Sequence, residues 1–105
     1  AILPVNAARA VNAQTILTAV AERYAVTSED LLSKKRTRDL TLPRQIAMYM
    51  IRDMTSLSTT AIGGELGGRD HTTVMHGCDQ IARMLQADPT LRKNLDDLKE
   101  SLLKG

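Results

Sequence analysis

The most informative segment of the sequence for the fold is Gly63-Gly64-Glu65-Leu66-Gly67-Gly68-Arg69-Asp70-His71-Thr72-Thr73. Apolar residues recur at helical spacing on both sides of it, which predicts a helix over residues 58–66 and another over residues 70–86. The pair Gly67-Gly68 ends the first helix, because glycine readily takes the left-handed backbone conformation found at helix C-termini. Two helices joined by a glycine turn predict a helix-turn-helix.

Two further glycines, Gly63 and Gly64, stand inside the first of these helices, where each costs about 1 kcal/mol relative to alanine. A partly frayed helix is one interpretation. We favour close packing of Gly63 against the next helix, because it lies four residues before Gly67, the spacing expected of a small residue at a helix crossing. The second helix has its apolar residues at Val74 and Cys78, later than in the commonest spacing, so we expect a longer turn than usual.

The rest of the chain also shows helical patterns and predicts no strand. The core must consist of Leu, Ile, Val, Met and Ala, because the sequence has no Trp or Phe and only two Tyr, and this composition favours helices. We therefore expect an all-α protein, a compact bundle of about six helices in which a basic loop precedes the helix-turn-helix. The other predicted helices are residues 13–24, a single turn from the N-cap Thr27 through Leu32, a helix that starts at Leu42-Pro43 and runs through Met54, and a final helix after Asp88-Pro89.

Length and composition limit the class of protein. The chain has 105 residues, one Cys, six Gly and three Pro, which fits a single domain without a disulfide framework. The longest unbroken apolar run, from Ile46 to Ile51, is far shorter than the ~20 residues that a membrane-spanning helix needs. Two aromatic residues cannot build the stacking platform on which single-stranded nucleic acid modules rely. We expect a soluble, cytoplasmic domain.

The positive charge of the sequence is concentrated in one place. The formal net charge is +2, but residues 34–52 hold six Lys or Arg against Asp39 alone. Four of these cations fall within Lys34-Lys35-Arg36-Thr37-Arg38. A solvated loop is one interpretation; however, like charges this close repel one another unless an anion meets them. A short basic loop between two helices suits a phosphate backbone or a narrow minor groove of DNA.

The second helix of the predicted helix-turn-helix begins with a run of polar residues, Arg69-Asp70-His71-Thr72-Thr73. An inserted helix presents its first residues to base edges in the major groove, and its first backbone N–H groups suit phosphate. Asp accepts from cytosine N4, Thr offers its methyl to thymine or its hydroxyl to phosphate, and His does either. For Asp70 alone, the alternative is an ordinary helix N-cap. The run as a whole favours contact with DNA.

The segment from Gly67 to His76 resembles the signature of the DnaA family of bacterial chromosomal replication initiators, in its C-terminal DNA-binding domain. The resemblance extends to residues 30–38 and 43–48, and it covers about residues 12–104. It implies an all-helical domain that binds duplex DNA at short, asymmetric boxes in the replication origin, in the cytoplasm at the bacterial nucleoid. It also implies that residues 1–11 are a connector from an upstream ATP-binding module and that residues 12–105 form the helix-turn-helix domain.

The same resemblance implies a set of DNA contacts. Arg36 would enter the minor groove. The second helix would read bases in the major groove through Asp70, His71 and Thr72, with Thr73 nearby. The residues expected to hold the phosphate backbone are Lys34, Lys35, Arg38, Arg44, Gln45 and Arg52.

The nucleotide-binding loop Gly-x-x-x-x-Gly-Lys-[Ser/Thr] of the family's ATP-binding module does not occur in the sequence. We therefore expect a non-enzymatic domain with no cofactor. We also expect no metal and a monomeric state, and the resemblance implies that the partner is double-stranded DNA. ATP hydrolysis, oligomerisation and origin melting would belong to the other parts of such an initiator. No residue marks a surface for regulatory proteins.

An enzyme or a metal site is one alternative class, drawing on Asp70, His71, His76, Cys78 and Asp79. His71 and His76 lie about 140° apart on a helix, so they cannot share a metal ion without distortion. Cys78 shares a helix face with apolar residues, and we expect it to be a small buried hydrophobe.

Two binding classes also remain open. A stripe of leucines near the C-terminus could pack on a partner helix, although such a stripe is more often core. A transcriptional repressor of the same architecture is the closer alternative. A stable dimer in solution would favour a repressor, because repressors of this class usually dimerise on palindromic operators. The stripe consists of Leu91, Leu95, Leu98 and Leu102.

Overall fold

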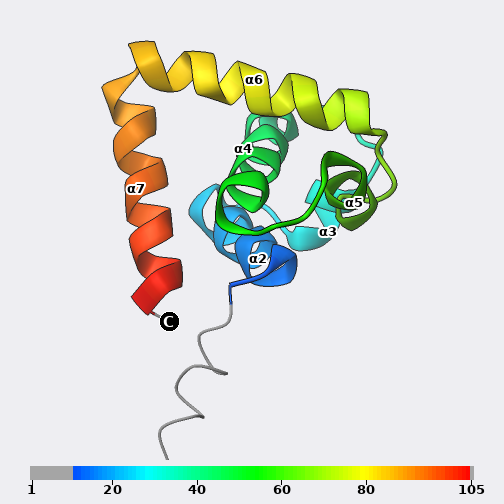
Figure 1. Cartoon of the computed structure of the whole chain (residues 1–105), viewed down its shortest axis with the longest axis horizontal. Helices are drawn as coiled ribbons and strands as arrows, with labels where there is room; N and C mark the ends of the chain where they lie inside the picture. Colours follow the sequence, from blue (N-terminus) through cyan, green and yellow to red (C-terminus); the bar gives the residue numbers. More distant parts are fainter. Residues whose placement is uncertain (1–10, 105) are drawn as a thin grey trace, which may run out of the picture.

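The computed structural model describes residues 11–104, and within this range it contains helices and no strand (Figure 1). The all-α prediction is confirmed, and the six helices of this range agree with the expected number. The connector predicted at residues 1–11 lies outside the described residues except for Val11. The helices are α2 Ala13–Arg23, α3 Ser28–Leu32, α4 Arg38–Met54, α5 Thr59–Glu65, α6 His71–Ala87 and α7 Pro89–Lys104.

Helix α4 lies at the centre of the fold. Helix α6 crosses it on one side and α2 packs against the other, while α5 lies beside α6, and α7 runs back from the end of α6 past α2 (Figure 1). Within residues 11–104, no helix combines the length and the apolar character needed to cross a membrane. The fully buried side chains include Ile16, Val20, Leu31, Ile46, Met50, Ile51, Ile62, Leu66, Val74, Ile81 and Leu95.

Side-chain caps define where several helices begin. The N-cap predicted at Thr27 is present, Asp70 forms the N-cap that was its alternative role, and Ser58 caps α5. Each side-chain oxygen accepts from the backbone N–H three residues on, at 2.9 Å for Thr27, 3.1 Å for Ser58 and 2.8 Å for Asp70. Helix α2 begins with a capping box between Asn12 and Thr15, which the sequence analysis did not anticipate. These bonds satisfy N–H groups that have no partner within the helix, so the helix starts follow from local sequence.

Helix α4 begins earlier than the sequence predicts. The expected start at Leu42-Pro43 is wrong: the helix starts at Arg38, and Pro43 lies inside it, although proline cannot supply a helical N–H. The reason is tertiary, because Leu40 is 4% exposed and its burial stabilises the additional turn. Arg38 therefore belongs to the first turn of α4, and we use the name basic loop for residues 34–37.

Helices α4 and α6 cross at Gly77, which is buried. A Cβ atom added to Gly77 would lie 2.6 Å from Sδ of Met48 and 3.4 Å from Cγ of Gln45. Any larger residue would displace Met48 from this contact. Glycine at the crossing therefore seats α6 closely on the middle of α4.

The turn between α5 and α6, residues 66–70, packs directly on α5. The carbonyl oxygen of Gly63 accepts from the backbone N of Gly68 at 3.0 Å and of Arg69 at 2.9 Å. A Cβ atom on Gly63 would lie 1.9 Å from the carbonyl oxygen of Arg69, whereas one on Gly64 would meet nothing within 4 Å. Gly63 is closely packed, as predicted, but its contact is with the turn that leads into α6 and not with the helix itself.

Candidate nucleic-acid interface

Two connections that are distant in the sequence lie side by side in the fold: the basic loop, which joins α3 to α4, and the turn between α5 and α6. Gly67 in the turn has a φ of +80°, and a Cβ atom there would lie 2.1 Å from the carbonyl oxygen of Leu32. Both the left-handed backbone and the lack of space require glycine at this position. Gly67 thereby allows the turn to lie against the segment that leads into the basic loop.

A hollow of about 370 Å³ lies between the basic loop and the start of α6. A second hollow of about 130 Å³ adjoins it along α4, and the two share Arg44, Arg69 and Thr73 as lining residues. We call the two hollows together the basic groove. The residues of the predicted site that line it are Lys34, Lys35, Arg36, Arg44, Gln45 and Thr73.

The cations beside the basic groove are largely free to meet an anion. The side chains of Lys34, Lys35, Arg36 and Arg38 are exposed. Among the described residues, their one ion pair joins Nζ of Lys35 to Oδ1 of Asp30 at 3.5 Å, and the lysine side chain is 64% exposed. An exposed pair of this length contributes little to stability, so the lysine remains available for another anion.

Of the polar residues at the start of α6, Thr73 lines the groove, whereas Asp70, His71 and Thr72 are not among its lining residues. His71, Thr72 and Thr73 are exposed, and Asp70 is the N-cap. Oδ1 of Asp70 accepts from the backbone N–H of Thr73, and this bond holds the pKa of the carboxyl below its usual range. Asp70 therefore has the structural role of an ordinary N-cap, and it remains an exposed carboxylate at neutral pH.

Arg44 differs from the expectation of an exposed phosphate ligand. Its side chain is 7% exposed, and burial lowers the pKa of its guanidinium. The guanidinium donates to backbone carbonyl oxygens just before and within the basic loop, so its main observed role is to hold that loop. The acceptors are the oxygens of Asp30 at 2.8 Å, Leu31 at 3.1 Å and Ser33 at 2.9 Å, and that of Lys35.

Arg69 makes contacts of the same kind from the opposite side. Its guanidinium donates to the carbonyl oxygen of Ser33 at 2.7 Å and of Leu31 at 3.5 Å, and also to that of Leu66. Burial lowers the pKa of Arg69, and the neighbouring charge of Arg44 lowers it further. In the sequence, Arg69 is recognisable only as one of five consecutive polar residues, and this role could not be predicted.

A signal for the buried position of Arg44 was present in the sequence. Arg44 lies four residues after Leu40, three before Ala47 and seven before Ile51, all of which are buried on α4. A basic residue on the apolar face of a helix must find partners inside the protein. No comparable pattern marks Arg69, because it lies in a turn.

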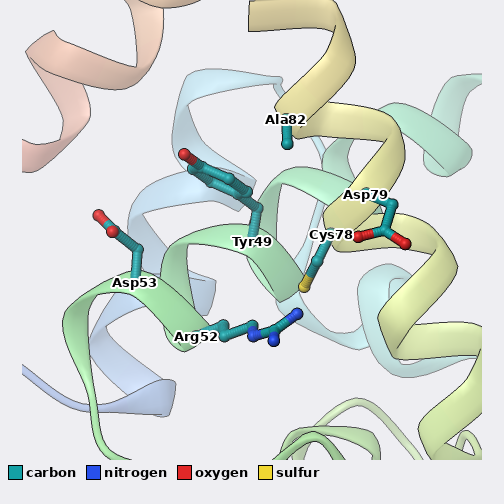
Figure 2. Close-up of a pocket in the computed structure, with 6 residues that line it drawn as sticks. All are labelled: Tyr49, Arg52, Asp53, Cys78, Asp79 and Ala82. Carbon is teal, nitrogen blue, oxygen red and sulfur yellow. The ribbon is translucent and has the colours of Figure 1, made fainter.

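Arg52 lies away from the basic groove. It borders a separate pocket of about 340 Å³ between α4 and α6, together with Tyr49, Asp53, Cys78, Asp79 and Ala82 (Figure 2). The expected burial of Cys78 is confirmed, since this residue is 3% exposed. Burial raises the pKa of its thiol, and the nearby Arg52 guanidinium partly offsets the increase. A buried thiol with a raised pKa does not favour the enzyme alternative.

The two histidines and the carboxylates of α6 do not assemble a metal site. His71 and His76 are both exposed. Over residues 11–104, no group of three or more His, Cys, Asp or Glu side chains is placed to hold a metal ion. The fold and the groove instead define a class of protein: a helix-turn-helix domain with a basic loop beside the start of its second helix.

Comparison with known proteins identifies the family. The family model described as "Bacterial dnaA protein helix-turn-helix" matches residues 13–81, and the chain belongs to this family. The matched region is the helix-turn-helix domain of DnaA, a non-enzymatic domain, and not its ATPase module.

Curated relatives and a solved structure agree with the family. The chain is 44% identical over 94 residues to the chromosomal replication initiator protein DnaA of Treponema denticola, covering 90% of this chain and 20% of that protein. It is 46% identical over 97 residues to the protein of the same name from Levilactobacillus brevis, covering 92% and 22%. The chain thus spans about a fifth of the length of these relatives. A crystal structure of a DNA replication initiation factor superposes with a TM-score of 0.77 at 31% identity, over 87% of this chain and 28% of the other.

Proposed function

We propose that this domain binds duplex DNA sequence-specifically at the boxes of a bacterial replication origin, and so takes part in initiating chromosome replication in the cytoplasm. One observation carries the proposal: the exposed cations of the basic loop line the same groove as Thr73, in the exposed polar first turn of α6. The family and the names of the relatives support the same biological process.

The proposed mode of binding uses both grooves of DNA. Helix α6 enters the major groove with its N-terminal end, so that Asp70, His71, Thr72 and Thr73 meet base edges. Arg36, on the adjacent basic loop, enters the minor groove, where a narrow A/T-rich stretch has an enhanced negative potential. The free N–H groups at the start of α6 suit a phosphate. Two elements that lie side by side can thereby reach adjacent grooves.

Affinity would come mainly from phosphate contacts. The candidates are the cations of the basic loop, Arg38 at the start of α4, Gln45 in the basic groove, and Arg52, which is exposed beside the separate pocket. The five cations of this set would neutralise about five phosphates, which predicts that log K falls with log salt at a slope of roughly −4.5. We propose that binding needs no metal or nucleotide, so treatment with EDTA should leave the affinity unchanged.

Fluorescence anisotropy with a duplex that carries an initiator box, and with a scrambled duplex of the same composition, tests the proposal. We expect the box to bind tighter by about a hundredfold or more, with saturation at one protein per box. Equal, salt-sensitive binding to both duplexes would contradict sequence-specific recognition. Absence of binding to either would contradict the DNA-binding function itself.

Substitutions separate the residues that read bases from those that hold phosphate. His71→Ala or Asp70→Ala should cost about 1–3 kcal/mol on the box and little on scrambled DNA. Arg52→Ala should weaken binding to both duplexes alike, because a phosphate contact carries no base information. An equal loss on both duplexes from all three variants would mean that the base-reading residues are assigned wrongly.

The oligomeric state distinguishes the initiator domain from a dimeric repressor. We propose a monomer, which fits a short asymmetric box, whereas a palindromic operator matches a twofold symmetric dimer. Sedimentation equilibrium of the free domain and of its complex with one box would decide between the two. A stable dimer in both samples would favour the repressor.

A further inference from the structure

Arg44 and Arg69 meet at the same two backbone carbonyl groups. The oxygen of Ser33 accepts from Nη2 of Arg44 at 2.9 Å and from Nη2 of Arg69 at 2.7 Å. The oxygen of Leu31 accepts from Nε of Arg44 at 3.1 Å and from Nη1 of Arg69 at 3.5 Å. Since Arg44 comes from α4 and Arg69 from the turn before α6, three elements are joined here. We call these two residues the arginine clamp.

The guanidinium donors of the clamp match the carbonyl groups at the end of α3 that lack helical partners. The last carbonyl groups of a helix lack helical partners and carry partial negative charge, and Leu31 lies at the end of α3. A guanidinium reaches several such oxygens at once because its donors form a rigid planar fork. Two neighbouring guanidiniums repel each other, and burial adds a desolvation cost, so the shared carbonyl oxygens must offset both.

The clamped atoms lie close in sequence to both proposed reading elements. Ser33 directly precedes the basic loop and is three residues before Arg36. Arg69 directly precedes Asp70, the N-cap of α6. The backbone contact of Gly67 with Leu32 leaves no side chain between the two connections. The loop and the start of α6 are therefore held together by backbone packing and by the clamp.

We propose that Arg69, together with Arg44, is a positioning residue for DNA recognition: the clamp fixes where Arg36 lies relative to the first turn of α6, so that minor-groove and major-groove contacts form together. This inference rests on the proposed DNA-binding function. Without the clamp, the basic loop has to be ordered when DNA binds, and the entropy of ordering opposes the contact made by Arg36. The contribution of Arg36 to binding thus depends on an arginine in a different element.

A double-mutant cycle measures this dependence. The box duplex is titrated with the wild type, Arg36→Ala, Arg69→Met and the double variant; methionine keeps an apolar stem and removes every donor. Arg36→Ala should weaken the wild type at least about tenfold, but weaken the Arg69→Met background by less than about threefold. An equal fold-loss from Arg36→Ala in both backgrounds would overturn the inference.

Arg83→Met is the matched control, because Arg83 is exposed in the second half of α6 and its side-chain partner is Gln80 in the same helix. It removes the same charge and leaves the clamp intact, so Arg36→Ala should keep its full cost in that background. A reduced cost there as well would assign the effect to net charge and overturn the inference. Circular dichroism verifies that each variant folds. If Arg69→Met does not fold, Arg69→Lys keeps the charge without the planar fork and is judged by the same criterion.

A modified duplex adds a readout that a purely structural role would not change. Replacing adenine by 2,6-diaminopurine in the A/T-rich part of the box places an amino group in the minor groove and leaves the major-groove edge of the base pair unchanged. The wild type should lose several-fold in affinity, and Arg69→Met should discriminate less; undiminished discrimination would overturn the inference. If the wild type does not prefer the box, the proposed function is contradicted. If it prefers the box but the effects of Arg36→Ala and Arg69→Met are not coupled, only the positioning role of the clamp is contradicted.

Discussion

The basic loop and helix α7 both carry many charges, but their charges have different surroundings. On α7, Lys93 and Lys104 pair with carboxylates one helical turn away, and Nζ of Lys99 lies 2.6 Å from Oδ2 of Asp53 on α4. At the basic loop, the described residues supply one ion pair, while carbonyl groups bind arginines from other elements.

The two regions are also held in place differently. Helix α7 is attached through its buried leucines, which include Leu95 at 2% exposed. The basic loop is held by backbone contacts at Gly67 and by the arginine clamp. Because the loop is held through its backbone, its own side chains remain free for a ligand. On α7, by contrast, the leucine side chains themselves hold the helix in the core. This difference distinguishes the proposed interface from its scaffold.

The largest expected effect tests the backbone contacts of the turn. Gly63→Ala should destabilise the domain by about 4 kcal/mol, because its Cβ would lie 1.9 Å from the carbonyl oxygen of Arg69 and the turn would have to move. Gly64→Ala is the control: its Cβ meets nothing within 4 Å, so the better helix propensity of alanine should stabilise by up to about 1 kcal/mol. Urea unfolding of both variants measures the difference, and similar midpoints would contradict the close contact.

The next effect tests the attachment of α7. Leu95→Ala should cost about 3 kcal/mol of unfolding free energy, since it leaves a cavity in the core. At temperatures where the variant is folded, its affinity for the box should equal that of the wild type, because α7 is scaffold. Leu103→Ala, at a side chain that is 64% exposed, should change stability by less than about 0.5 kcal/mol. A large loss of box affinity in folded Leu95→Ala would show that α7 takes part in binding.

Removing one positive charge from each region compares them directly. Arg36→Ala should lower box affinity by about 1–3 kcal/mol and reduce the salt slope by about 1. Lys93→Ala removes the same charge from α7 and should leave both quantities unchanged, because no residue of α7 lines the basic groove. Anisotropy titrations at several salt concentrations give both values. Equal losses would mean that net charge, and not its location, determines binding.

The smallest effect concerns the start of α6 at low pH. The backbone N–H of Thr73 holds the pKa of Asp70 below its usual range. A lowered pKa in the folded state contributes stability above the unfolded pKa of about 3.9, and this contribution is lost as the pH falls through the folded value. Asp70→Asn keeps an accepting oxygen but does not titrate, so its stability should fall less steeply with acid than that of the wild type. Asp96→Asn on α7 serves as the control, and unfolding midpoints from pH 7 to pH 2.5 are the measurement.

Much of the fold could be predicted from local sequence. The caps at Thr27, Ser58 and Asp70 bind an N–H three residues away, so the information for each helix start lies within one turn. The start of α4 could not be predicted in this way. Its first turn buries Leu40, which is 4% exposed, and that burial outweighs the preference of proline for a helix start.

The proposed site was only partly predictable. The exposed cations and the polar first turn of α6 are visible as a charge run and as a polar run in the sequence, and the structure brings Lys34, Lys35 and Arg36 of the first run to the same groove as Thr73 of the second. Whether these side chains touch DNA stays a prediction. Arg44 belonged to the same basic set, yet its guanidinium is buried, where it donates hydrogen bonds to backbone carbonyl oxygens and not to solvent.

Local patterns in the chain specify most of the helices, several of their caps, the glycine turn and the family, because apolar spacing and capping act over a few residues. Which arginines face solvent and which hold the loop depends on how the helices pack. Ser33 is 11 residues from Arg44 and 36 from Arg69 along the chain, so its carbonyl oxygen becomes their common acceptor only after α3, α4 and the turn have packed together. A buried guanidinium needs several carbonyl oxygens as acceptors, and these oxygens come close together only in the folded chain.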